Sequence, residues 1–134
     1  MADVSVPDQV RVSLRVLRAT PALLYLAFIW LVSARPGDSL PTRVDDRIAH
    51  FGEYFLLMLL VMFALTAFDP VRIQPRTLLA AGGFSFAWAI LDEVHQSFVP
   101  GRFPSVKDVA FDLVGIAAAA ALMAFLATRD RRRA

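Results

Sequence analysis

The sequence predicts an all-α protein, a membrane bundle of about four transmembrane helices with a polar cluster at its outer face. The first observation is composition, because 57% of the residues are hydrophobic and the mean hydropathy is +0.57, well above that of a soluble domain. The second is spacing, because long apolar segments alternate with short stretches rich in proline and charge. A chain of 134 residues suffices for one domain. We therefore expect a single transmembrane domain over residues 1–134.

The first apolar segment lies between Arg18 and Arg35. Arginines precede it, and Val32-Ser33-Ala34 resembles a small-residue cleavage site, so a cleaved signal peptide is an alternative interpretation. The further apolar segments downstream favour a retained first helix.

Three more helices are expected at about residues 48–68, 77–96 and 108–128. Crossing a hydrocarbon core of roughly 30 Å takes about 20 helical residues. The charge-free runs within these segments are shorter, so each helix must include polar residues at its end. These residues are His50, Glu53, Asp92, Glu93, Asp108 and Asp112.

Four spans place both termini on one side of the membrane, and that side carries nine of the 14 lysines and arginines. The positive-inside rule therefore predicts an inner (cytoplasmic) membrane protein with both termini in the cytoplasm. The basic tail at residues 129–134 follows an apolar run, which suits membrane lipids better than nucleic acid. We expect membrane lipids as partners and no nucleic acid.

This topology brings polar residues of three helices to the outer membrane face. Helical spacing aligns them in one stripe on each helix. The stripes are Asp46, His50 and Tyr54; Asp92 and Gln96 with Glu93 beside them; and Asp108, Asp112 and Gly115. Polar side chains in lipid turn toward the bundle interior, so we expect a shared pocket that opens outward.

His50 is a candidate catalytic residue. Asp46 lies one turn away, and its carboxylate could orient the imidazole and raise its basicity as a general base. A boundary histidine without a special role is the alternative.

Asp92 and Glu93 are the other candidate catalytic residues. Adjacent carboxylates at a helix C-terminus repel each other and need a partner such as Arg102 or Arg47, a shared proton or a bound cation. A salt-bridge cluster that holds the helix ends together is the alternative.

The remaining polar residues are candidate substrate-binding groups: Asp46, Arg47, Tyr54, Gln96, Arg102, Asp108 and Asp112. Arg102 follows a Pro-Gly pair in a loop, where a guanidinium suits phosphate or carboxylate. Asp45 and Asp108 also fit a simpler role, because residues 42–45 and 105–108 have the spacing of a capping box.

We predict no metal site and no cofactor. The chain has no cysteine, and His50, Glu53, Glu93 and Asp108, although competent ligands, form no compact metal-binding motif. We interpret His95, Trp30 and Trp88 as packing or interface residues.

Together these residues resemble the VanZ-like family of small membrane proteins. The matching motifs are Asp46-Arg47, His50-Phe51 and Tyr54; then Asp92-Glu93, Gln96 and Phe98-Val99-Pro100-Gly101-Arg102; then Asp108 and Asp112-Leu113-Val114-Gly115. The resemblance covers residues 46–115, with Arg47 where the family has lysine and Asp112 where it has asparagine. It implies a multi-pass bacterial membrane protein, in some members linked to antibiotic resistance through reduced teicoplanin susceptibility.

Three functions remain open. The first is a pocket that binds or modifies a lipid-linked cell-wall precursor or another anionic envelope molecule. The second is a non-catalytic membrane module or partner subunit whose polar cluster is structural. The third, a small proton-coupled transporter, is the weakest, because the middle of each span is apolar. Whether the protein is an enzyme is left open.

Overall fold

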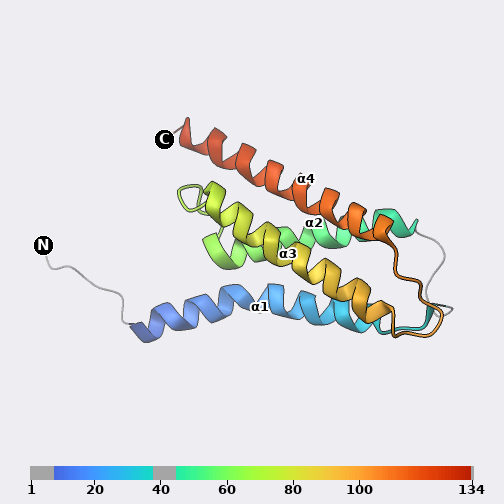
Figure 1. Ribbon diagram of the computed structural model, residues 1–134. Coiled ribbons are helices and arrows are strands. Elements are labelled where there is room, and N and C mark those ends of the chain that lie inside the picture. The colour runs from blue at the N-terminus through green and yellow to red at the C-terminus, as the bar shows by residue number, and fades with distance from the viewer. Residues whose placement is uncertain (1–7, 38–44, 134) are drawn as a thin grey trace, which may run out of the picture.

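The computed structural model describes residues 8–37 and 45–133, with the backbone alone for residues 8–11. These residues form four α-helices and no strand (Figure 1). The helices are α1 (Asp8–Ser33), α2 (Asp46–Thr66), α3 (Pro75–Gln96) and α4 (Val106–Arg131). The predicted all-α class and number of helices are confirmed.

All four helices are long and apolar enough to cross a membrane. The shortest, α2, has 21 residues and is therefore about 31 Å long, which matches a hydrocarbon core of roughly 30 Å. Large apolar side chains such as Leu79, which is 76% exposed, cover the outer surface of the bundle. A long helical bundle with such a surface is a multi-pass membrane protein.

The helices run up and down, and α2 lies at the centre, where it packs against the other three (Figure 1). One end of the bundle carries the α2–α3 turn and the end of α4. The opposite end, which we call the polar end, is where α1 and α3 finish and α2 and α4 begin. The four-helix topology thus gathers the starts and ends that the sequence marks as polar.

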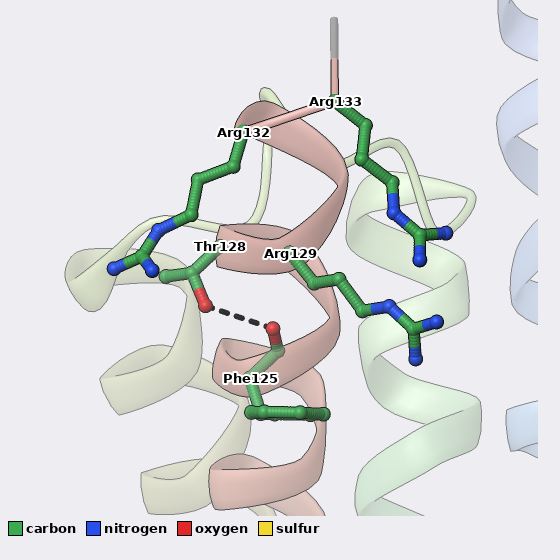
Figure 2. Close-up of a pocket in the computed structure, with 5 residues that line it drawn as sticks. All are labelled: Phe125, Thr128, Arg129, Arg132 and Arg133. Atoms are coloured by element: carbon green, nitrogen blue, oxygen red, sulfur yellow. Dashed lines mark hydrogen bonds between the residues drawn. The ribbon is translucent and has the colours of Figure 1, made fainter.

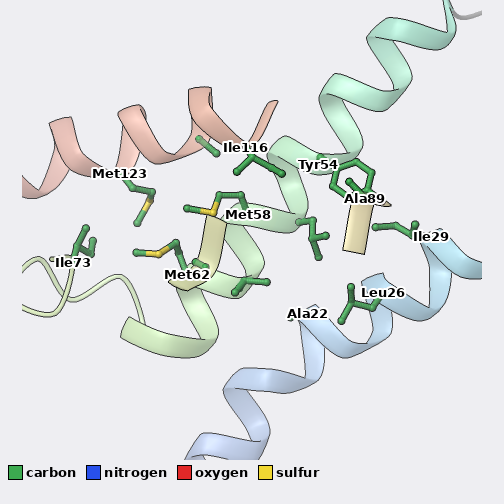
Figure 3. Packing of buried hydrophobic residues seen from close by; sticks show 14 of the residues in the cluster. Ala22, Leu26, Ile29, Tyr54, Met58, Met62, Ile73, Ala89, Ile116 and Met123 are labelled. Carbon is green, nitrogen blue, oxygen red and sulfur yellow. The ribbon is translucent and has the colours of Figure 1, made fainter. Parts of the chain in front are cut away.

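The interior changes character along the bundle. Its apolar part is built around α2, whose Met58 and Met62 belong to one buried cluster with Ile116 and Met123 of α4 (Figure 3). On α3 the inward stripe changes from small residues to polar ones toward the polar end: Ala81, Ser85, Ala89, Asp92, Glu93 and Gln96. The expectation that polar side chains turn inward in lipid is confirmed for these residues.

The beginning of α2 differs from the prediction. Asp45 itself caps the helix, because its side chain accepts a hydrogen bond from the Arg47 backbone N–H at 3.0 Å. The predicted capping box, in which Thr42 would cap and Asp45 would follow inside the helix, is therefore wrong. Thr42 lies outside the described residues.

Helices α2 and α4 approach each other closely at Gly115. A Cβ atom built there would overlap the backbone carbonyl oxygen of Phe51 and come within 3.0 Å of the Phe55 nitrogen. Only glycine permits this separation of the two backbones, as at the small-residue contacts common between membrane helices. The close contact lies one turn from Asp112 on α4 and one residue from His50 on α2.

At the other end, Arg131 fastens α4 to the α2–α3 turn. Its guanidinium donates hydrogen bonds to the carbonyl oxygens of Pro70, at 3.1 and 2.6 Å, and of Ile73, at 2.7 Å. The guanidinium brings two nitrogens to these carbonyls, whereas a lysine ammonium would bring one.

Candidate functional site

The most buried polar pair in the bundle joins His50 of α2 to Asp112 of α4. The imidazole Nδ1 lies 3.0 Å from Asp112 Oδ1, and both side chains are almost fully buried. The close approach at Gly115 makes this contact possible. The carboxylate that orients His50 is therefore Asp112, and the expectation that Asp46 would do so is wrong.

Asp92 and Gln96 form a second buried group on α3. The Gln96 amide donates to Asp92 Oδ2 at 2.9 Å, as their spacing of one turn allows. The same nitrogen lies 3.4 Å from the hydroxyl oxygen of Ser33, the last residue of α1. Gln96 thus connects the ends of α1 and α3.

Glu93 contacts the start of α4. Its Oε2 accepts a hydrogen bond from the Ser105 backbone N–H at 2.7 Å, while the Ser105 hydroxyl caps α4 by accepting from the Lys107 N–H. Ser105 is thus the cap that the sequence predicts. In a capping box Asp108 would accept the Ser105 N–H, but Glu93 occupies that donor.

The predicted ion pairs between the acids of α3 and Arg47 or Arg102 are absent. Among the described residues, side chains of opposite charge approach within 4.0 Å only at His50–Asp112 and Arg72–Asp69. Arg47 is exposed and lies over the ring of Phe111, 5.9 Å from its centroid. A salt-bridge cluster does not account for the buried acids.

Three buried polar atoms of the predicted site have no hydrogen-bond partner in the described part of the chain: Tyr54 Oη, Asp92 Oδ1 and Glu93 Oε1. An unsatisfied buried polar group costs about 1–3 kcal/mol, so natural proteins rarely leave several together. Such a group indicates a proton, a water molecule or a ligand that these atoms contact. All three belong to residues predicted for the site.

An open cavity of about 340 Å³, which we call the polar pocket, lies at the polar end. Its lining residues are Gly37, Asp46, Gln96, Gly101, Arg102, Phe103 and Asp108. Four of these are predicted substrate-binding residues. The loops after α1 and α3 form part of the wall.

Hydrogen bonds join these two loops. The Gly37 N–H donates to the Pro100 carbonyl at 3.3 Å, and Arg102 Nε donates to the Arg35 carbonyl at 3.4 Å. A Cβ atom at Gly37 would overlap the Gly101 carbonyl, and Gly101 has a φ of 74° that favours glycine. These contacts hold the Arg102 backbone at the rim of the polar pocket.

Sequence analysis missed Gly37 and Ser33, which contribute to this end of the bundle. The matched Pro36-Gly37 and Pro100-Gly101 pairs were a signal that two tight loops meet there. The packing interpretation of His95 and Trp30 agrees with the structure, because their rings stack at 3.8 Å. Glu53 is half-buried on α2 and does not line the polar pocket.

Two further cavities lie at the opposite end. One, of about 400 Å³, is lined by Phe125, Thr128, Arg129, Arg132 and Arg133 (Figure 2). Its arginines extend to different sides of α4, and its hydrogen bond runs within the helix from Thr128 to the Phe125 carbonyl (Figure 2). The other, of about 330 Å³, is lined mainly by apolar residues such as Leu59 and Met123. Neither contains a buried polar group that lacks a partner.

The fold and the polar end define a class: a four-helix, multi-pass membrane protein with a buried histidine–carboxylate pair beside a polar pocket. The VanZ/LLP1 family model matches residues 5–127. The chain therefore belongs to the VanZ/LLP1 family, as its motifs indicate. No curated protein and no solved structure matches it.

Proposed function

We propose that the polar pocket binds a lipid-linked or anionic molecule of the cell envelope. The observation that supports this most directly is Arg102, which lines the pocket without a carboxylate within 4.0 Å among the described residues. A guanidinium that no acid neutralises is suited to phosphate or carboxylate, which it can bind through two parallel hydrogen bonds.

The pocket opens at the end of a bundle whose apolar surface would contact lipid tails. A ligand with a charged headgroup and an acyl or polyprenyl chain suits such a position, because its headgroup could enter the pocket while its chain stays in the bilayer. By the distribution of arginines, we propose that this end faces outward and that both termini are cytoplasmic. Lipid-linked cell-wall precursors are exposed on that side, which accords with a role in teicoplanin susceptibility.

Chemistry on the bound molecule is a further part of the proposal. A histidine whose second nitrogen is held by a buried carboxylate is the arrangement of an oriented general base. Here Asp112 orients His50, and Asp92 and Glu93 each keep one buried oxygen free. These residues would accept or supply a proton for a headgroup held by Arg102.

A second candidate is a non-catalytic module in which the same cluster fastens the helix ends. The bond between Glu93 and the Ser105 N–H favours it, because this contact ties α3 to the start of α4. Glu93→Gln separates the two candidates. Glutamine keeps an oxygen that accepts the Ser105 N–H but loses the charge, so a structural role would survive and an acid–base role would not.

The experiment is complementation of a deletion strain, scored by envelope precursor profile and teicoplanin susceptibility. We expect Arg102→Ala and Glu93→Gln to lose function at normal expression. Lys107→Ala is the matched control, because Lys107 is an exposed cation nearby that does not line the pocket. Normal phenotypes for both site variants would overturn the proposal, and loss in Arg102→Ala alone would favour binding without acid–base chemistry.

Topology is tested separately with reporters fused after Pro41, Arg72, Arg102 and Arg133. We expect external reporters after Pro41 and Arg102 and cytoplasmic reporters after Arg72 and Arg133. An external reporter after Arg72 would overturn the proposed orientation.

A further inference from the structure

We infer that Asp46, His50 and Asp108 form a binding site for one divalent transition-metal ion at the polar end. The inference rests on the proposed function, because the ion would complete the same pocket for an anionic ligand. With the ion bound, His50 Nε2 is its ligand and not a general base, so proton transfer is left to Asp92 and Glu93. It also revises our sequence-based expectation that the chain has no metal site. Asp46 was absent from the ligands considered there.

The first observation is geometric. One ligand atom from each of the three residues lies within 4.8 Å of the others, although they come from two helices. Atoms that coordinate one ion at about 2.0–2.2 Å lie at most about 4.4 Å apart. Asp46 is exposed and Asp108 only half-buried, so small side-chain rotations would bring their oxygens to that separation.

The second observation concerns His50 alone. Its side chain is more than nine-tenths buried, and its Nδ1 is bonded to Asp112. In the neutral tautomer whose Nδ1–H donates to that carboxylate, Nε2 carries the lone pair, and no described residue bonds to it. Metal-ligating histidines commonly give their second N–H to a carboxylate in this way, which fixes the tautomer and strengthens the ligand.

The two carboxylates are also free to coordinate. Asp108 would ordinarily accept the Ser105 N–H at the start of α4, but Glu93 occupies that donor. Neither the Asp46 nor the Asp108 carboxylate forms a hydrogen bond or an ion pair with another described residue. Both line the polar pocket, so an ion between them would be accessible from it.

The charges that line the polar pocket suggest what a bound ion would do. The pocket is lined by the acids Asp46 and Asp108 and by one base, Arg102, so its two carboxylates oppose the attraction of Arg102 for an anion. A divalent cation bound to the two acids reverses that balance and presents an open coordination position to a phosphate or carboxylate. One nitrogen and two oxygen ligands suit Zn²⁺ or Mn²⁺ better than Ca²⁺ or Mg²⁺, which prefer oxygen alone.

The test is titration of the purified, EDTA-treated full chain in detergent with Mn²⁺, followed by electron paramagnetic resonance, and with Zn²⁺, followed by calorimetry. We expect one ion per chain. Asp108→Asn and Asp46→Asn should each weaken binding at least tenfold, and Asp112→Asn should weaken it about 10–100-fold through His50. Asp130→Asn is the control, an exposed acid of α4 at the opposite end.

Absence of stoichiometric binding to the wild type, or unchanged binding in the Asp46 and Asp108 variants, would overturn the inference. Asp46 is exposed, so Asp46→Asn keeps the test valid if a buried variant fails to fold. No anionic ligand is present in the titration. If the wild type binds the ion but Arg102→Ala complements the deletion strain normally, the proposed function alone is rejected. If Arg102→Ala fails to complement but the wild type binds no ion, the metal site alone is rejected.

Discussion

The contact at Gly115 allows a quantitative prediction for Gly115→Ala. The added methyl group would overlap the Phe51 carbonyl oxygen and press on the Phe55 nitrogen. Both atoms belong to the backbone of α2, so they cannot move aside as the end of a flexible side chain could. The helices must separate, and the His50–Asp112 pair lies within one turn of the contact.

Overpacking of this kind costs about 1–3 kcal/mol. Replacing a helical glycine by alanine returns at most about 1 kcal/mol through helix propensity. We therefore expect Gly115→Ala to lower the free energy of unfolding by about 1–2 kcal/mol. The loss would be larger if the buried pair also breaks, because an uncompensated buried charge costs about 3–5 kcal/mol.

The assay is reversible unfolding in mixed micelles with increasing SDS, followed by circular dichroism. Gly83→Ala and Gly52→Ala are matched controls, because a Cβ atom at either position meets nothing within 4 Å. We expect both to be neutral or up to about 1 kcal/mol more stable than the wild type. Equal stability of Gly115→Ala and Gly83→Ala would refute the role of the close contact.

Two further predictions use the same unfolding assay or hydrogen exchange. Asp112→Asn keeps an acceptor for His50 and should lower the free energy of unfolding by less than about 1.5 kcal/mol. Asp112→Leu leaves the imidazole without a partner and should lower it by about 3 kcal/mol. Equal losses in the two variants would contradict the His50–Asp112 pairing. Arg131→Lys should speed amide exchange in the α2–α3 turn, because the substitution removes the Nε–H bond to the Pro70 carbonyl and leaves one nitrogen for both carbonyls. Exchange no faster than in Arg132→Lys would contradict this.

Hydropathy and length were sufficient to predict the four spans and the end of the bundle at which polar residues gather. The ends of the helices were less accurate, and α2 begins at Asp46, capped by Asp45 rather than Thr42. The capping pattern is only four residues long and fits more than one register, so it could not distinguish these positions.

Contacts between helices could not be predicted from the sequence. Helical periodicity identifies neighbours on one helix, which is why Asp46 was expected to orient His50. The packing of α4 against α2 instead brings Asp112 into hydrogen-bond contact with the imidazole. Gly115 was recognised as a small surface, but its partner on α2 depends on packing. Glu93 accepts a hydrogen bond from the Ser105 backbone N–H, and residue type does not reveal which backbone N–H will be the donor.

The most direct test of the central claim, that the polar pocket binds an anionic envelope lipid, is native mass spectrometry of the protein released from its own membranes. We predict that the wild type and Lys107→Ala retain a phosphate- or carboxylate-bearing lipid and that Arg102→Ala, equally folded and expressed, does not. Equal retention by all three proteins would contradict the claim.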